Sequence, residues 1–76
     1  MTVADLILGQ SARILAIDAN PALEAKLREI GFCEGDSVQL IAFGPFGGKP
    51  LAVRLNRRII AMRFEEAAAL SIGAAQ

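Results

Sequence analysis

Few side chains of this 76-residue chain have the chemistry to catalyse a reaction or to hold a metal ion. The chain has no histidine, the side chain that most often serves as general base and as metal ligand. Cys33 is its single cysteine, and one thiol without a histidine forms neither a Cys–His dyad nor a zinc site. Glu65 and Glu66 are adjacent, so we expect them on different sides of a turn, without a convergent partner. We therefore predict a protein that is not an enzyme and has no cofactor or tight metal site. A weak contact of surface carboxylates with a divalent transition metal ion stays open.

The glycine-rich segment 44–50, Gly-Pro-Phe-Gly-Gly-Lys-Pro, has the composition of a phosphate-binding loop. It lacks the Ser or Thr that follows the lysine of a P-loop, and no helix is expected after it, so a P-loop is excluded. Its glycines permit positive φ and its prolines restrict the backbone, which predicts a stiff loop between two strands. Phe46 at its tip either folds back onto the domain or contacts a partner.

The basic residues are unevenly placed, although eight Lys and Arg balance eight Asp and Glu. Lys49, Arg54, Arg57, Arg58 and Arg63 lie in a stretch without an acidic residue. We interpret this stretch as a solvated strand face and expect no nucleic-acid partner, because the chain has no Trp or Tyr on which bases could stack. The alternative is a self-assembling or nucleic-acid-binding regulatory barrel that uses Arg54, Arg57, Arg58 and Arg63.

The length and the cysteine content predict a single cytoplasmic domain over residues 1–76. One cysteine rules out an internal disulfide and suits a reducing compartment. No segment reaches the roughly 18 apolar residues that a membrane-spanning helix needs, and the first residues lack the pattern of a secretory signal. We expect no direct insertion into a membrane.

The chain is apolar for its size, with 54% hydrophobic residues and a mean hydropathy of +0.45. A domain this small buries only about 60% of the surface of its unfolded chain. We therefore expect some of Ile41, Phe43, Phe46, Ile59 and Phe64 to stay on the surface. An exposed apolar patch is typical of a contact with a partner or with a second copy of the chain.

A single regular helix is predicted after Asn20-Pro21. Asn accepts hydrogen bonds from the first free amides of a helix, and Pro suits the first helical position. Leu23, Leu27 and Ile30 then form one apolar stripe, and Gly31 is placed to end the helix in a left-handed conformation.

Short runs of apolar residues, separated by turn residues, predict five strands. We place the strands at 13–18, 37–43, 51–55, 59–64 and 70–72, with helical turns at 3–8 and 65–69. The first strand is apolar on both faces and is expected to be buried on both. The fold class is therefore mainly β with one short helix, a small five-stranded SH3-like barrel.

The order of these motifs resembles the FeoA family of ferrous iron transport accessory proteins over about residues 6–72. The matching fragments are Leu-Ile-Leu-Gly at 6–9, Leu-Arg-Glu-Ile-Gly-Phe at 27–32 with Glu-Gly at 34–35, the loop 44–50, and Ile-Ala-Met-Arg at 60–63 with Glu-Ala at 66–67. The chain departs from the family pattern at two positions. Lys49 stands where the family often has Asp, and Phe64 stands where a polar residue is usual.

The resemblance implies a cytosolic accessory role in ferrous iron uptake. Its implied partner is the cytosolic part of a FeoB-type membrane transporter, which carries an intracellular G-protein domain. A related module forms the C-terminal domain of iron-dependent repressors, but the initial Met and the lack of a DNA-binding helix pair favour a free-standing protein. We predict that Phe43, Pro45, Phe46 and Lys49 contact the partner, because a rigid loop with an exposed aromatic offers contact area at low entropic cost.

Overall fold

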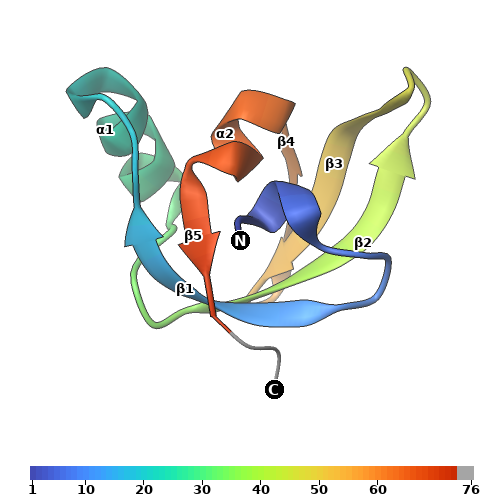
Figure 1. Ribbon diagram of the computed structural model, residues 1–76, viewed down its shortest axis with the longest axis horizontal. Helices are drawn as coiled ribbons and strands as arrows, with labels where there is room; N and C mark the ends of the chain where they lie inside the picture. The colour runs from blue at the N-terminus through green and yellow to red at the C-terminus, as the bar shows by residue number, and fades with distance from the viewer. Residues whose placement is uncertain (74–76) are drawn as a thin grey trace.

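The computed structural model describes residues 1–73 and contains five strands, two α-helices and one short 3₁₀-helix. In chain order these are η1 (Val3–Asp5), β1 (Ser11–Ile17), α1 (Pro21–Ile30), β2 (Ser37–Gly44), β3 (Gly48–Leu55), β4 (Arg58–Met62), α2 (Phe64–Ala68) and β5 (Leu70–Ile72). The strands form one antiparallel sheet in the order β4-β3-β2-β1-β5 (Figure 1). The predicted mainly-β, SH3-like fold is confirmed. The expectation of a single helix is corrected, since the turn foreseen at 65–69 is a second α-helix that begins at Phe64.

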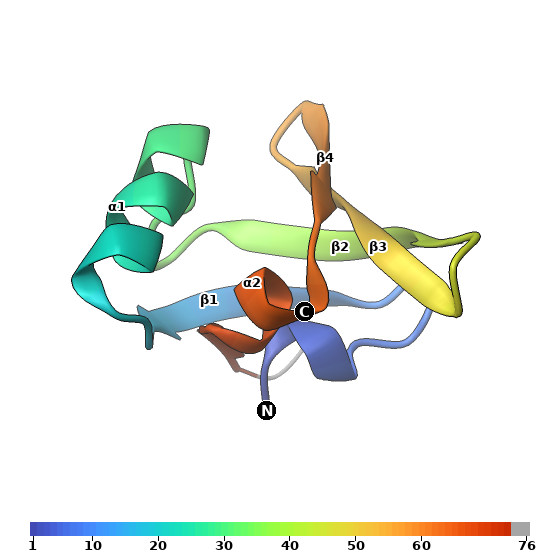
Figure 2. The same cartoon turned by 90° about the horizontal axis from the view of Figure 1, so that it is seen from above.

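The barrel closes through helices rather than through a last strand pair. β4 and β5 are the two ends of the sheet, and α2 connects them while packing against η1 (Figure 2). The N-terminal residues cover the free edge of β5, where Thr2 pairs with Ser71 and the N–H of Ile72 donates to the carbonyl of Met1 over 3.0 Å. The start of the chain thereby occupies an edge that would otherwise expose unpaired backbone groups.

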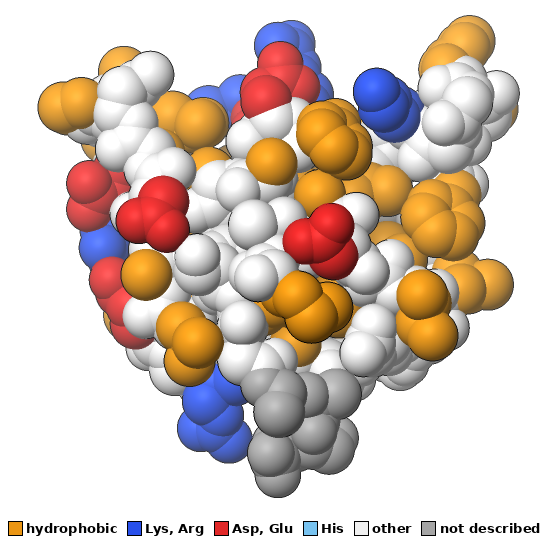
Figure 3. All heavy atoms as spheres, viewed as in Figure 1, with side chains coloured by type: hydrophobic (Ala, Val, Ile, Leu, Met, Phe, Trp, Pro, Cys, Tyr) orange, Lys and Arg blue, Asp and Glu red, His pale blue; other side chains and the backbone are white. Residues whose placement is uncertain are grey.

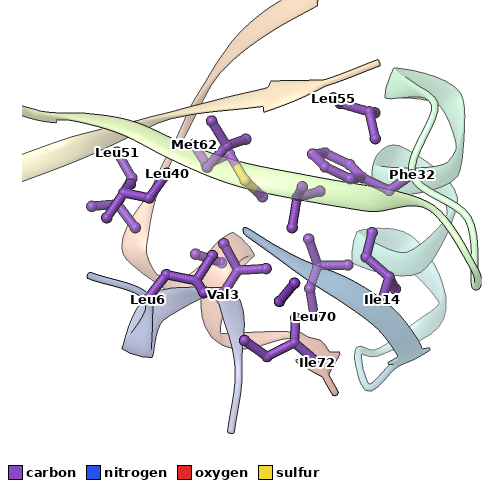
Figure 4. Packing of buried hydrophobic residues seen from close by; sticks show 14 of the residues in the cluster. Val3, Leu6, Ile14, Phe32, Leu40, Leu51, Leu55, Met62, Leu70 and Ile72 are labelled. Carbon is purple, nitrogen blue, oxygen red and sulfur yellow. The ribbon is translucent and has the colours of Figure 1, made fainter. Parts of the chain in front are cut away.

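The core lies on the concave side of the sheet (Figure 4). Leu51, Val53 and Leu55 alternate inward from β3 and are at most 5% exposed, as predicted, whereas Arg54 points outward. Side chains from β1, η1 and β5 belong to the same core, whereas β4 contributes Met62 as its one fully buried residue.

Helix α1 has the expected boundaries. The side chain of Asn20 accepts a hydrogen bond from the N–H of Leu23 over 2.8 Å, and Gly31 has φ of +124°. A side chain at position 31 would also meet the guanidinium of Arg58, which donates to the carbonyl of Ile30. Leu27 from the apolar stripe is fully buried and closes one end of the core.

Two expectations about the strands are wrong. β1 is not buried on both faces, because its outward-facing residues Arg13 and Leu15 are exposed within residues 1–73, Leu15 by 58%. The loop predicted at 44–50 is a shorter turn, since β2 runs to Gly44 and β3 already begins at Gly48. Gly44 and Gly48 are paired in the ladder, which carries the hairpin almost to its tip.

The expectation that Glu66 lacks a convergent partner is wrong, because its carboxylate is buried and accepts hydrogen bonds. Its side chain is 7% exposed and accepts from the Lys26 ammonium over 2.6 Å, which joins α2 to α1. Its second oxygen accepts from the backbone N–H of Arg63 over 2.9 Å, at the start of α2. The hydrogen bond from Lys26 is the main cause that holds the pKa of Glu66 below its ordinary value, against the opposing effect of burial.

We predict that Leu27→Ala lowers the free energy of unfolding by about 2–5 kcal/mol, because it leaves a cavity in the core. Leu15→Ala removes the same atoms from an exposed site and should change stability by no more than about 0.5 kcal/mol. Urea unfolding followed by circular dichroism measures both. Equal losses of unfolding free energy for the two variants would contradict the packing of Leu27 in the core.

We predict a stability contribution from Glu66 that depends on pH. Since folding lowers the pKa of Glu66, the ionised carboxylate stabilises the fold above its unfolded pKa of about 4.3. That contribution is lost as pH falls through the lower, folded pKa. Glu66→Gln should therefore melt below the parent at pH 7, and the gap in Tm should narrow below about pH 4. Exposed Glu65→Gln is the matched control, and a gap that stays constant with pH would refute the assignment.

Candidate functional site

The surface has an open groove of about 410 Å³ between the β2–β3 hairpin and the start of α2. It is lined by Phe46, Lys49, Pro50, Arg63, Phe64 and Glu65. Hydrophobic side chains gather in this region between α2 and the hairpin, with basic groups beside them (Figure 3). The groove therefore offers apolar contact area at its centre and charges at its margin.

One wall of the groove is the hairpin, whose tip is held tightly. The N–H of Phe46 donates to the carbonyl of Lys49 over 3.1 Å, and the N–H of Lys49 donates back over 3.3 Å. Gly44 is required for this close approach, because a Cβ there would run into the backbone carbonyl of Lys49. Phe46 is left 79% exposed, so it does not fold back onto the barrel.

The other wall begins at Phe64, the first residue of α2. The ammonium of Lys49 lies 4.8 Å from the centre of the Phe64 ring, a cation–π contact that links the two walls. Such a contact contributes about 0.5–1 kcal/mol at an exposed site. Lys49 and Phe64, the two positions that the sequence analysis expects to differ from the family pattern, therefore meet in space. Phe64 is still 47% exposed and can contact a partner.

The predicted contact residues are only partly brought together. Phe46 and Lys49 line the groove, whereas Phe43 and Pro45 do not. Phe43 is 53% exposed and lies against Gly48 of the same hairpin. The prediction missed Pro50 and the α2 wall, Arg63 to Glu65. The sequence contains one signal for Phe64. This aromatic residue stands between two charged residues, at the predicted end of a strand.

Apolar side chains remain on the surface both in the groove and outside it. Phe46 and Phe64 in the groove, and Phe43 and Ile59 outside it, are each about half exposed or more, which confirms the expectation of an apolar surface. Ile41 is half-buried.

The four arginines of the alternative interface do not share one surface. Arg63 lines the groove, Arg54 lies on the outer face of β3, and Arg58 reaches the end of α1. Arg57 lies in the exposed turn between β3 and β4. A continuous track for a nucleic-acid backbone would need these charges along one path.

The structure offers no arrangement for metal coordination within the residues it describes. No group of three or more Cys, Asp or Glu side chains lies close enough to hold an ion in residues 1–73. Cys33 is a free, exposed thiol. In the same part of the chain, no helix is both long and apolar enough to cross a membrane.

Comparison with known protein families and solved structures shows what this chain is similar to. The family model described as the FeoA domain matches residues 1–73. A crystal structure of FeoA from Stenotrophomonas maltophilia, complexed with zinc, is 37% identical over 96% of this chain and 89% of that one, with a TM-score of 0.84. Its description presents it as a prokaryotic SH3 domain protein and a candidate ferrous iron transport activating factor. Among curated proteins, none matches the chain significantly.

Two further structures share the fold over longer proteins. Iron(II) transport protein A from Clostridium thermocellum is 28% identical with a TM-score of 0.87, over 95% of this chain but 44% of that one. The chain thus spans less than half the length of that relative. A manganese-dependent transcriptional repressor in complex with manganese has a TM-score of 0.87 at 17% identity, over all of this chain and 36% of that one, which shows a common fold alone.

We predict that Gly44→Ala distorts the hairpin more than Gly47→Ala does. At Gly44 the added Cβ meets backbone atoms, whereas at Gly47 it has open space and only the left-handed φ of +66° is unfavourable. Gly47→Ala should lower the free energy of unfolding by about 1–2 kcal/mol, and Gly44→Ala should lower it by more. Urea unfolding gives both values, and a milder effect of Gly44→Ala would contradict the close approach.

Proposed function

Since this chain belongs to the FeoA domain family, we propose that it is a cytoplasmic accessory protein of ferrous iron uptake that binds the cytosolic part of a FeoB-type membrane transporter. Two relatives support the connection with iron, since one is named iron(II) transport protein A and the other is described as a candidate activating factor of ferrous iron transport. In this proposal the chain acts by contact and not by catalysis.

The observation that carries the proposal is the exposed Phe46 beside an apolar groove. The side chain of Phe46 is 79% exposed, and its apolar surface is solvated unfavourably in the free protein. A partner that covers the ring removes this apolar area from water, which favours binding. The hairpin that presents it is fixed by two backbone hydrogen bonds, so little conformational freedom is lost on binding. Aromatic anchors seated beside pockets commonly dominate the energy of protein interfaces.

The charges at the margin of the groove favour a defined orientation of the partner. Lys49 and Arg63 provide two positive charges, and Glu65 provides a negative charge on the same side as Phe64. Charges at the rim of an interface mainly affect the rate of association and specificity, while the apolar centre supplies affinity. We infer that the partner presents apolar side chains flanked by at least one carboxylate.

We predict that Phe46→Ala leaves the fold intact and weakens binding to the isolated cytosolic part of the transporter by at least about tenfold. Isothermal titration calorimetry measures the affinity, and circular dichroism checks the fold. Ile59→Ala removes a similarly exposed apolar side chain from β4, outside the groove, and serves as the matched control. Unchanged affinity for Phe46→Ala would remove the groove from the interface.

The role in uptake requires a test in cells. Ferrous iron uptake is measured with and without the chain while the amount of transporter is checked, and Phe46→Ala is then supplied in its place. Lost uptake at an unchanged transporter level supports the accessory role. If Phe46→Ala instead abolishes self-association in solution and leaves transporter binding unchanged, the groove joins copies of this chain.

A further inference from the structure

A second hollow lies at the opposite end of β2 and β3 from the hairpin tip. It has a volume of about 190 Å³ and is lined by Ser11, Ser37, Val38, Gln39, Arg54 and Asn56. Val38 and Leu55 point into the core, so their neighbours Ser37, Gln39 and Arg54 point to the outer face of the sheet. The hollow therefore lies on the polar outer face of the sheet, and its polar side chains do not contribute to the core.

The register of the sheet brings its polar residues together. Ser11 pairs with Gln39, and Gln39 pairs with Arg54, so these three side chains form one row across β1, β2 and β3. In the next row Arg13 pairs with Ser37. Arg54 ends the first row on β3, and Arg13 belongs to the second row on β1, two strands or about 10 Å away across the sheet.

The donors around this hollow are not used by the protein itself. The side chains of Ser11, Ser37, Arg54 and Asn56 make no hydrogen bond to another described residue, and neither Arg13 nor Arg54 has an ion-pair partner within residues 1–73. Lys26 and Arg28, in contrast, are both paired with carboxylates. No acidic residue occurs anywhere between positions 37 and 64. The hollow therefore combines positive charge with several free donors.

Gln39 is the exception, and its contact orients the site. Its amide nitrogen donates to the carbonyl of Gly9 over 3.0 Å, which holds the side chain on the segment that precedes β1. The neighbouring hydroxyls and guanidinium keep their hydrogen-bonding capacity for a ligand.

We propose that this hollow binds an oxyanion of the phosphate class, held by the guanidinium of Arg54 and the hydroxyls of Ser11 and Ser37, with Arg13 adding a second positive charge. Guanidinium groups donate two parallel hydrogen bonds to phosphate oxygens, a geometry that the single ammonium of a lysine does not reproduce. The volume of about 190 Å³ lies below the 300–1,000 Å³ typical of pockets for whole organic ligands. The hollow thus fits a phosphate group alone, either as the free ion or as the head of a larger molecule.

The free ion and an anionic lipid headgroup share this chemistry, and two measurements separate them. In the first, the full chain labelled with ¹⁵N is titrated with inorganic phosphate at constant ionic strength, with chloride as the reference anion. Saturable shifts centred on the amides of Ser11, Ser37 and Arg54 are expected. In the second, sedimentation compares vesicles of phosphatidylcholine with vesicles that also contain phosphatidic acid.

Substitutions decide whether binding is specific. Arg54→Gln should weaken binding at least tenfold, whereas Arg57→Gln removes an exposed arginine that does not line the hollow and should change it less than twofold. Saturable binding of inorganic phosphate that depends on Arg54 supports a soluble ligand, and Arg54-dependent binding to acidic vesicles alone supports a lipid headgroup. Shifts that do not saturate, or that are equal in both variants, overturn the proposal. Phe46→Ala should have no effect in either measurement, so this test stands apart from that of the transporter interface.

Discussion

The fold depends on one buried carboxylate at the place where the sheet does not close on itself. β4 and β5 end the sheet, and the chain must cross from one to the other through α2. Glu66 fixes this crossing, because one of its oxygens accepts from the N–H of Arg63 and the other from the ammonium of Lys26. An ionised group at 7% exposure is tolerated only when its oxygens are paired in this way. Since Phe64 and Glu65 lie in the same turn of helix, the position of the groove wall follows from that of Glu66.

The groove joins two elements whose stiffness has different origins. The hairpin is stiff because its backbone is paired up to the tip and because Gly44 lets the two strands approach. The α2 wall is stiff because Glu66 anchors it to α1. The contact between Lys49 and Phe64 spans the two walls and contributes less than either anchor. A partner thus meets an apolar surface that is already in place.

The two hollows use opposite ends of β2 and β3 and differ in chemistry. The groove lies by the hairpin tip and is apolar at its centre, whereas the polar hollow lies near Ser37 and Asn56. About six residues of extended strand separate Gly44 from Ser37, which corresponds to roughly 20 Å. At that separation a partner in the groove and an anion in the polar hollow do not compete for the same side chains. The ends of one pair of strands thereby supply two independent surfaces.

Features that depend on near neighbours in the chain were predictable from the sequence. The cap at Asn20, the stop at Gly31 and the inward alternation of Leu51, Val53 and Leu55 were all predicted, because each is set by the local backbone and its hydrogen bonds. The hairpin followed from the same kind of signal, whereas the sequence left open whether Phe46 folds back onto the domain, and the structure leaves it 79% exposed.

Contacts between residues far apart in the chain became visible in the folded structure. Lys26 and Glu66 are 40 positions apart, and the ion pair between them is not visible in the local sequence around Glu66. The contact of Lys49 with Phe64 and the row formed by Ser11, Gln39 and Arg54 likewise depend on strand register. No local pattern encodes such pairings, because they arise from the way the whole chain packs its apolar faces around one core.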